Sequence, residues 1–66
     1  MKGQIEIKIL EHLDPKWEAC LEGFSIRREG RLTILQGKLK DQAQLHGILH
    51  FIRDLNLTLI SVNSLE

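Results

Sequence analysis

The sequence predicts a single small α+β domain over residues 1–66, built as a two-layer sandwich with helices on one face of a four-stranded sheet. Apolar and polar residues alternate in several short runs, which is typical of half-buried strands. One longer stretch repeats apolar residues every three or four positions, which is typical of an amphipathic helix. The elements follow the order strand, short helix, strand, strand, long helix, strand. This β-α-β-β-α-β order favours a ferredoxin-like arrangement.

The alternating runs place the strands. Residues 4–11 alternate isoleucine with polar side chains and predict the first strand. Residues 24–28 and 31–38 form the next two, and Glu29-Gly30 between them predicts a tight hairpin turn. Gly37 indicates a bulge or a close backbone contact. The fourth strand, over residues 57–62, is apolar on both faces, so we expect it to be well covered.

Two stretches predict helices. Asp14-Pro15 is typical of a helix start and predicts a helix of about two turns that ends at Gly23. The longer helix spans residues 41–55, where Asp41 and Gln44 form a capping box and Asn56 can end the helix in a left-handed conformation. Its apolar arc comprises Leu45, Ile48, Leu49, Phe51, Ile52 and Leu55, and its opposite arc comprises Ala43, His46, Gly47, His50, Arg53 and Asp54.

The short first connection leaves one alternative open. A crossover between parallel strands needs about a dozen residues or more, and the segment between the first two strands is close to that limit. If the short helix does not cross the sheet, the first three strands form an antiparallel meander. The sheet then carries only the long helix, together with the fourth strand, and its other face needs a partner.

Charge and composition argue against several classes of protein. Nine lysines and arginines balance nine acidic residues, so no long-range field steers the chain onto nucleic acid or an anionic membrane. The apolar runs are too short to span a bilayer, and the first residues lack the apolar core of a signal peptide. Cys20 is the single cysteine and cannot form an internal disulfide. We therefore expect a reduced, cytoplasmic protein. Leu65-Glu66 also fits the remnant of a tag and carries no weight in the argument.

One motif covers much of the second half of the chain. Residues 41–49 read DQAQLHGIL, residues 52–55 read IRDL and residues 59–62 read LISV. Together with Leu13-Asp14, Trp17 and Gly23, they resemble a family of small bacterial proteins with the signature D-Q-A-x-L-H-G-x-L, then I-R-D-L, then L-I-S-V. The resemblance implies a single-domain bacterial protein and transfers no activity and no active-site residues. It marks His46 and Arg53-Asp54 as signature positions and leaves His50 outside the signature.

Two histidines of the long helix are candidate metal ligands. His46 and His50 are four residues apart, so their imidazoles share one helix face and could chelate zinc, nickel or copper. A third ligand would have to come from Asp54, one turn further along, or from His12. We favour the plainer interpretation, two polar residues on a solvent-facing surface. The sequence therefore assigns no metal, cofactor or catalytic residue.

Other reactive groups also have a plain interpretation. Cys20 could act as a nucleophile near His12, but its helical spacing from Trp17 favours a small core residue. The only basic cluster lies at the hairpin and comprises Arg27, Arg28 and Arg31. Because the exposed strand faces lack aromatic residues for base stacking, we interpret this cluster as a solvated hairpin and expect no nucleic-acid partner.

The sequence favours a non-catalytic interaction or regulatory module that forms a homodimer. A domain of this length buries only about 60% of the surface of its unfolded chain, so the monomer is marginal. The alternative is an amino-acid sensor that resembles ACT-type domains, which share this element order and place Asp-Pro after the first strand. Asp14-Pro15 matches, whereas Lys16 stands where those domains have glycine. An enzyme is least favoured, because a pocket would need walls from a second subunit.

Overall fold

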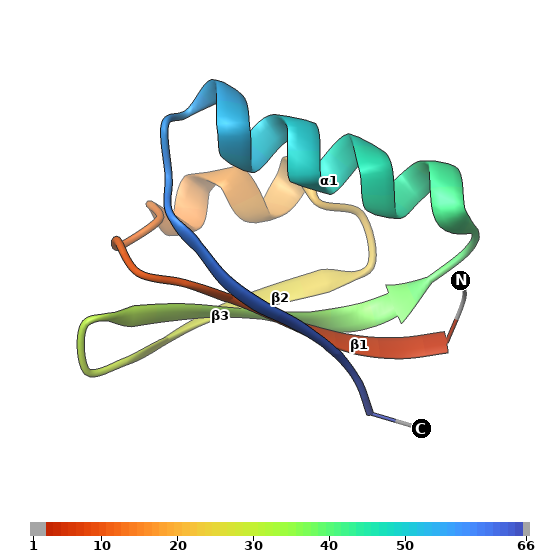
Figure 1. Ribbon diagram of the computed structural model, residues 1–66, viewed down its shortest axis with the longest axis horizontal. Coiled ribbons are helices and arrows are strands. Elements are labelled where there is room, and N and C mark those ends of the chain that lie inside the picture. Colours follow the sequence, from red (N-terminus) through yellow and green to blue (C-terminus); the bar gives the residue numbers. More distant parts are fainter. Residues whose placement is uncertain (1–2, 66) are drawn as a thin grey trace.

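The computed structural model describes residues 3–65 as a four-stranded sheet with one α-helix and one 3₁₀ helix. Figure 1 shows both helices on the same side of the sheet. The predicted small α+β domain and the order of its elements are therefore confirmed. The strands are β1 (Gly3–Ile9), β2 (Phe24–Glu29), β3 (Leu32–Leu39) and β4 (Leu59–Ser64), and the helices are η1 (Pro15–Cys20) and α1 (Gln42–Asp54).

The strands lie in the order β2-β3-β1-β4, and each neighbouring pair is antiparallel. β3 thus separates β1 from β2, and these two strands run in the same direction without pairing. The alternative meander, in which β1 would pair with β2, is wrong. The connection through η1 crosses the helical side of the sheet, where Leu13 and Leu21 are buried, and delivers β2 to the far side of β3.

The core fills the space between the sheet and the two helices. β1 is a central strand and alternates strictly, so one of its faces contributes three buried isoleucines. The buried face of α1 meets this layer from above and is made of Leu45, Ile48 and Ile52. Burial of this apolar layer is the main driving force for folding. The remaining core residues are Leu13, Leu21, Phe24, Leu35 and Leu39.

The first helix differs in geometry from the prediction. It is a 3₁₀ helix and not two turns of α-helix, although it begins where Asp14-Pro15 predicts. Asp14 Oδ1 accepts a hydrogen bond from the Lys16 N–H at 3.0 Å and so caps the helix. Trp17 is half-buried and meets Phe51 of α1 edge-on, with 5.4 Å between the ring centroids. Because so short a helix is unstable alone, this contact with α1 stabilises it.

Local signals at the ends of α1 are confirmed. Asp41 Oδ1 accepts a hydrogen bond from the Gln44 N–H at 2.9 Å. The Gln44 side chain reaches back as a capping box would, but it accepts from the Lys40 N–H at 2.7 Å, one residue before the cap. Asn56 has a φ of 57° and ends the helical region in the left-handed conformation.

The hairpin loop lies one residue later than predicted, at Gly30-Arg31, with a φ of 63° at Gly30.

β4 is the element whose surroundings the sequence predicts wrongly. It pairs only with β1 and therefore forms an edge of the sheet. Leu59 is 43% exposed and Ile60 is 50% exposed, so the strand is not well covered. The physical reason is the strand order, because α1 packs toward β3 and no described element lies beyond β4. Within the described residues, no helix is long and apolar enough to cross a membrane.

Candidate functional site

The two candidate metal ligands lie on the outer surface of α1. His46 and His50 are exposed and line a small hollow of about 210 Å³ with Leu49 and Arg53. His46 Nε2 lies 3.5 Å from the side-chain nitrogen of Gln42. The Arg53 guanidinium at the same hollow disfavours a cation by charge repulsion. The arrangement therefore favours a solvated polar face.

The proposed third ligands do not join this histidine pair. His12 lies beside the β2–β3 hairpin instead, where its Nε2 is 3.1 Å from the Gly30 carbonyl oxygen. Asp54 is exposed and does not line the hollow. Across residues 3–65, no three side chains of the kinds that bind metals are grouped closely enough to hold an ion.

Cys20 is exposed, so its prediction as a core residue is wrong. The 3₁₀ helix ends at Cys20, and Leu21, just outside the helix, supplies the buried side chain in its place. Cys20 is left at the rim of a groove between η1 and α1, with a volume of about 620 Å³. We call this the η1–α1 groove. Leu21, Ile48 and Phe51 contribute its apolar lining, and Gly47 leaves space in which a Cβ would meet no atom within 4 Å.

The polar groups around the η1–α1 groove are engaged in structural contacts. Gln44 donates from its side-chain nitrogen to the Glu22 carbonyl oxygen at 3.1 Å and so ties α1 to the loop after η1. Lys40 Nζ lies 3.5 Å from a Glu22 carboxylate oxygen, and both side chains are largely exposed. An ion pair this exposed contributes little to stability. The groove is thus an open, partly apolar depression, and the Gln44, Glu22 and Lys40 groups around it already bond to one another.

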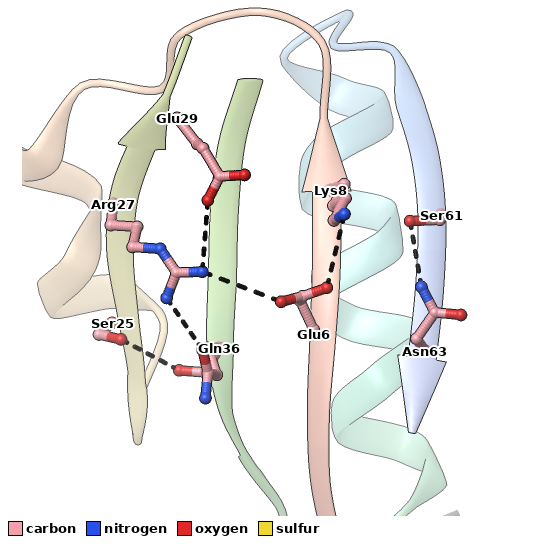
Figure 2. A network of polar contacts seen from close by, with 8 residues as sticks. All are labelled: Glu6, Lys8, Ser25, Arg27, Glu29, Gln36, Ser61 and Asn63. Carbon is pink, nitrogen blue, oxygen red and sulfur yellow. Dashed lines mark hydrogen bonds and ion pairs between the residues drawn. The ribbon is translucent and has the colours of Figure 1, made fainter. Parts of the chain in front are cut away.

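The side of the sheet opposite the helices carries a polar network (Figure 2). Arg27 stands at its centre, with Nη1 donating to Gln36 Oε1 at 3.1 Å and Nη2 3.7 Å from a Glu29 carboxylate oxygen. Glu6 lies between Arg27 and Lys8, at 4.0 Å and 3.9 Å from their nitrogen atoms. Arg27, one of the three arginines of the hairpin cluster, is therefore neutralised by Glu6 on β1 and Glu29 on β2. The charged side chains of this network are two acidic and two basic, and no residue drawn in it is aromatic.

One apolar residue lies beneath this network. Ile34 of β3 is only 1% exposed, although it does not belong to the core between sheet and helices. Its register partners are Lys8 on β1 and Arg27 on β2. Long charged side chains can cover apolar surface with their methylene groups while their charged ends remain in water. Charged side chains therefore cover Ile34, and the open face of the sheet has no apolar patch at its centre.

The two edges of the sheet differ in their protection. On the β2 edge, the Ile26 N–H donates to Glu18 Oε2 of η1 at 3.2 Å, and Arg27, Arg28 and Glu29 are all exposed. Charged residues and bonded edge amides prevent a strand from pairing with another chain. The β4 edge has no such defence, because residues 55–65 contain no charged residue, no proline and no glycine. The apolar faces of residues 57–62 predicted a well-covered strand, whereas the absence of charge along the same stretch is the sequence signal of an open edge.

β4 is nonetheless held firmly on β1. At its start, the Glu11 carboxylate accepts hydrogen bonds from the Thr58 N–H at 2.6 Å and from Thr58 Oγ1 at 2.7 Å. The bond from the backbone N–H and then the bond from the hydroxyl lower the pKa of Glu11 below its usual value of 4.5. At its end, the Leu65 N–H donates to the Gln4 carbonyl oxygen at 2.9 Å. The exposed edge is thus an ordered strand.

Glu66, part of the suspected tag remnant, lies outside the described residues, as do Met1 and Lys2.

The Asp14-Pro15 loop is used for structure as well. Asp14 caps η1, as described above, and Lys16 Nζ lies over the Trp17 ring, 5.3 Å from its centroid. A cation in this position is attracted by the electron-rich face of the indole. The Asp14-Pro15 loop, the feature shared with ACT-type domains, is therefore occupied by a capping contact and a cation–π contact.

Comparison with known proteins shows which family of domains the chain resembles. A family described as "Domain of unknown function (DUF8691)" matches residues 4–63, which include every strand and helix of the fold apart from Gly3 and Ser64 at strand ends. No curated protein and no solved structure matches the chain. Since the match extends over most of the 66 residues, this chain belongs to the DUF8691 family of domains of unknown function.

Proposed function

We propose that this protein is a non-catalytic interaction or regulatory module that acts as a homodimer. The observation that carries the proposal is the unprotected β4 edge, where exposed apolar side chains coincide with an absence of charge. Natural proteins usually block such edges, because an open strand recruits another strand. A small domain that is marginal as a monomer also gains stability when it associates.

The polar groups support a non-catalytic role. Gln44, Glu22 and Arg27 are engaged in contacts that hold elements together. Catalytic groups, in contrast, need a partner that activates them beside a space for the substrate. These three side chains act as ties between elements and as surface cover.

Sedimentation velocity of the purified protein, from low to high micromolar concentration, tests self-association. We expect the weight-average mass to rise toward twice that of the chain. A mass that remains at the monomer value over the whole range would contradict the proposal. Added zinc is the control for metal-driven association through His46 and His50, and we expect it to leave the result unchanged.

We further propose a ferredoxin-like fold in which η1 stands in place of a full first helix. The insertion of β3 between β1 and β2 supports this, because a split β-α-β unit has that form. The motif at residues 41–49 supports a bacterial origin, and the single cysteine supports a reduced, cytoplasmic protein. A solved structure would test the fold directly, with a different strand order as the contradicting result.

A second candidate function is the binding of a small ligand such as an amino acid. The η1–α1 groove favours it, because about 620 Å³ lies within the usual size range of ligand sites. Thermal-shift measurements with the common amino acids would detect such a ligand. If no amino acid raises the melting temperature, this candidate is wrong, whatever the oligomeric state.

A further inference from the structure

The hydrogen-bond pattern of β4 shows which of its backbone groups face outward. The Leu65 N–H donates to Gln4 on β1, and the regular register then pairs Asn63 with Glu6 and Ser61 with Lys8. In an antiparallel pair, residues alternate between those bonded to the neighbour and those whose backbone groups point away from it. Val62 lies between Ser61 and Asn63, so its N–H and C=O point to the open edge.

We infer that a second copy of this chain pairs with β4 edge to edge, antiparallel, about a two-fold axis at Val62. This inference rests on the proposed homodimer and names its surface and register. The Val62 N–H of each copy donates to the Val62 carbonyl oxygen of the other. The two sheets thereby join into one eight-stranded sheet with β2 at both outer edges.

The side chains of β4 are complementary to themselves in this register. Val62 meets its own copy on the helical side of the sheet, because its register partner Ile7 faces the core. Ser61 of each copy lies opposite Asn63 of the other copy. The two-fold axis therefore creates two such pairs of a hydroxyl and an amide on the polar face of the sheet. Paired β-branched residues and paired polar residues both stabilise neighbouring strands.

The difference in charge between the β4 edge and the β2 edge indicates which molecule pairs with β4. A charged peptide would leave its charges opposite an edge that offers no counter-charge between residues 55 and 65. A second β4 is equally uncharged and brings no such cost. The β2 edge cannot serve the same purpose, because Glu18 already accepts from the Ile26 N–H and Arg27 and Arg28 stand beside it. Pairing therefore stops at two copies and does not extend into a fibre.

The bulge at the start of β4 limits where pairing can occur. The register on β1 shifts between Lys8 and Ile9, so that Ile60 has no Cα partner there. Bulges bend a strand and raise its twist, which disfavours pairing at that point. The regular part of β4 begins at Ser61, and this places the two-fold axis at Val62 and away from Leu59.

Disulfide trapping tests the register. Cys20 is first replaced by serine, since it is exposed, and Val62→Cys is then introduced. Facing residues in a hydrogen-bonded antiparallel pair have their Cα atoms about 5.5 Å apart, within disulfide reach. We expect a covalent dimer under mild oxidation. Ile26→Cys is the matched control, because Ile26 is also β-branched, half-buried and on an edge strand, and it should remain monomeric.

A charge at the edge tests the surface without a cross-link. Ile60→Lys places a lysine directly beside the paired segment that begins at Ser61, on a side chain that is 50% exposed, so the fold should survive, and we expect dimerisation to weaken by about tenfold or more. Leu10→Lys is the control: it changes a residue that is 43% exposed but lies beyond the end of the central strand β1, and it should leave dimerisation unchanged. Circular dichroism establishes that both variants are folded.

The outcomes separate this inference from the proposed function. If the parent protein dimerises but Val62→Cys cross-links no faster than Ile26→Cys and Ile60→Lys still dimerises, the edge inference is wrong and the homodimer stands. If the parent protein is monomeric at every concentration, both are wrong. Rapid trapping of Val62→Cys together with loss of the dimer in Ile60→Lys supports both.

Discussion

Gly37 lies against the backbone of β2 at a distance that leaves no room for a side chain. A Cβ built on it would lie 2.8 Å from Phe24 Cγ and 2.9 Å from Phe24 Cα, and nearer still to the Gly23 carbonyl oxygen. Gly37 and Phe24 are register partners in the β2–β3 ladder. The neighbours therefore cannot retreat unless the two strands separate locally, and Gly37→Ala must distort the sheet.

The loss of stability expected for Gly37→Ala depends on the kind of atoms that the added Cβ meets. Overpacking a core site costs about 1–3 kcal/mol, and backbone neighbours, which cannot change rotamer, put this site at the upper end. In a domain of this size, each kcal/mol shifts the melting temperature by about 4–8 °C. We therefore expect Gly37→Ala to lower the melting temperature by roughly 10–20 °C.

Gly47→Ala is the matched control, because it makes the same change in a different environment. A Cβ at Gly47 would meet no atom within 4 Å, and the residue lies inside α1. Alanine is favoured over glycine within a helix by about 0.5–1 kcal/mol, so this variant should be more stable than the parent. Thermal and urea unfolding followed by circular dichroism, at one protein concentration, measure both variants.

The reasoning is refuted if Gly37→Ala unfolds within about 0.5 kcal/mol of the parent, or if Gly47→Ala loses as much stability as Gly37→Ala. If Gly37→Ala does not fold, the same substitution is measured in the Gly47→Ala background, where the added helix stability raises the starting point. A stable double variant with an unchanged midpoint relative to Gly47→Ala alone would also contradict the steric argument.

Three further predictions follow from single contacts. Thr33→Val should cost about 1–3 kcal/mol in urea unfolding despite its similar shape, because Thr33 Oγ1 is buried and accepts from the Leu13 N–H at 3.0 Å, and an unchanged midpoint would contradict this. The stabilisation from the Glu11 carboxylate should be complete above its usual pKa of 4.5 and be lost as the pH falls through its lowered pKa in the folded protein. Carbon NMR titration should place the Glu11 pKa below that of an exposed glutamate, and Thr58→Val should restore it only in part, because the Thr58 N–H remains. Cys20 should react with a thiol reagent in the native protein nearly as fast as in urea, and slow labelling that tracks unfolding would show that it is buried after all.

Much of the local structure was predictable because it depends on residues close in sequence. Asp14-Pro15 determines where η1 starts, and Asp41 determines the start of α1 through a bond to an amide three residues away. Asn56 ends α1 in a conformation that asparagine tolerates better than most residues. The alternation of β1 and the periodicity of α1 likewise determine which face each element buries. None of these features requires knowledge of a distant partner.

The neighbours of each element were decided only in three dimensions. Cys20 was assigned to the core from its helical spacing, but η1 is a 3₁₀ helix and Leu21 takes the buried position. β4 was assigned a covered place from its apolar composition, but the strand order puts it at the edge. The amino-acid pattern of an apolar strand is the same whether a helix, a strand or a second molecule covers it. By itself, the sequence determined where the elements lie and which faces β1 and α1 bury, because those depend on local backbone preferences and periodicity. Only the tertiary structure decided which edge stays open, because strand order depends on contacts between residues far apart in the chain.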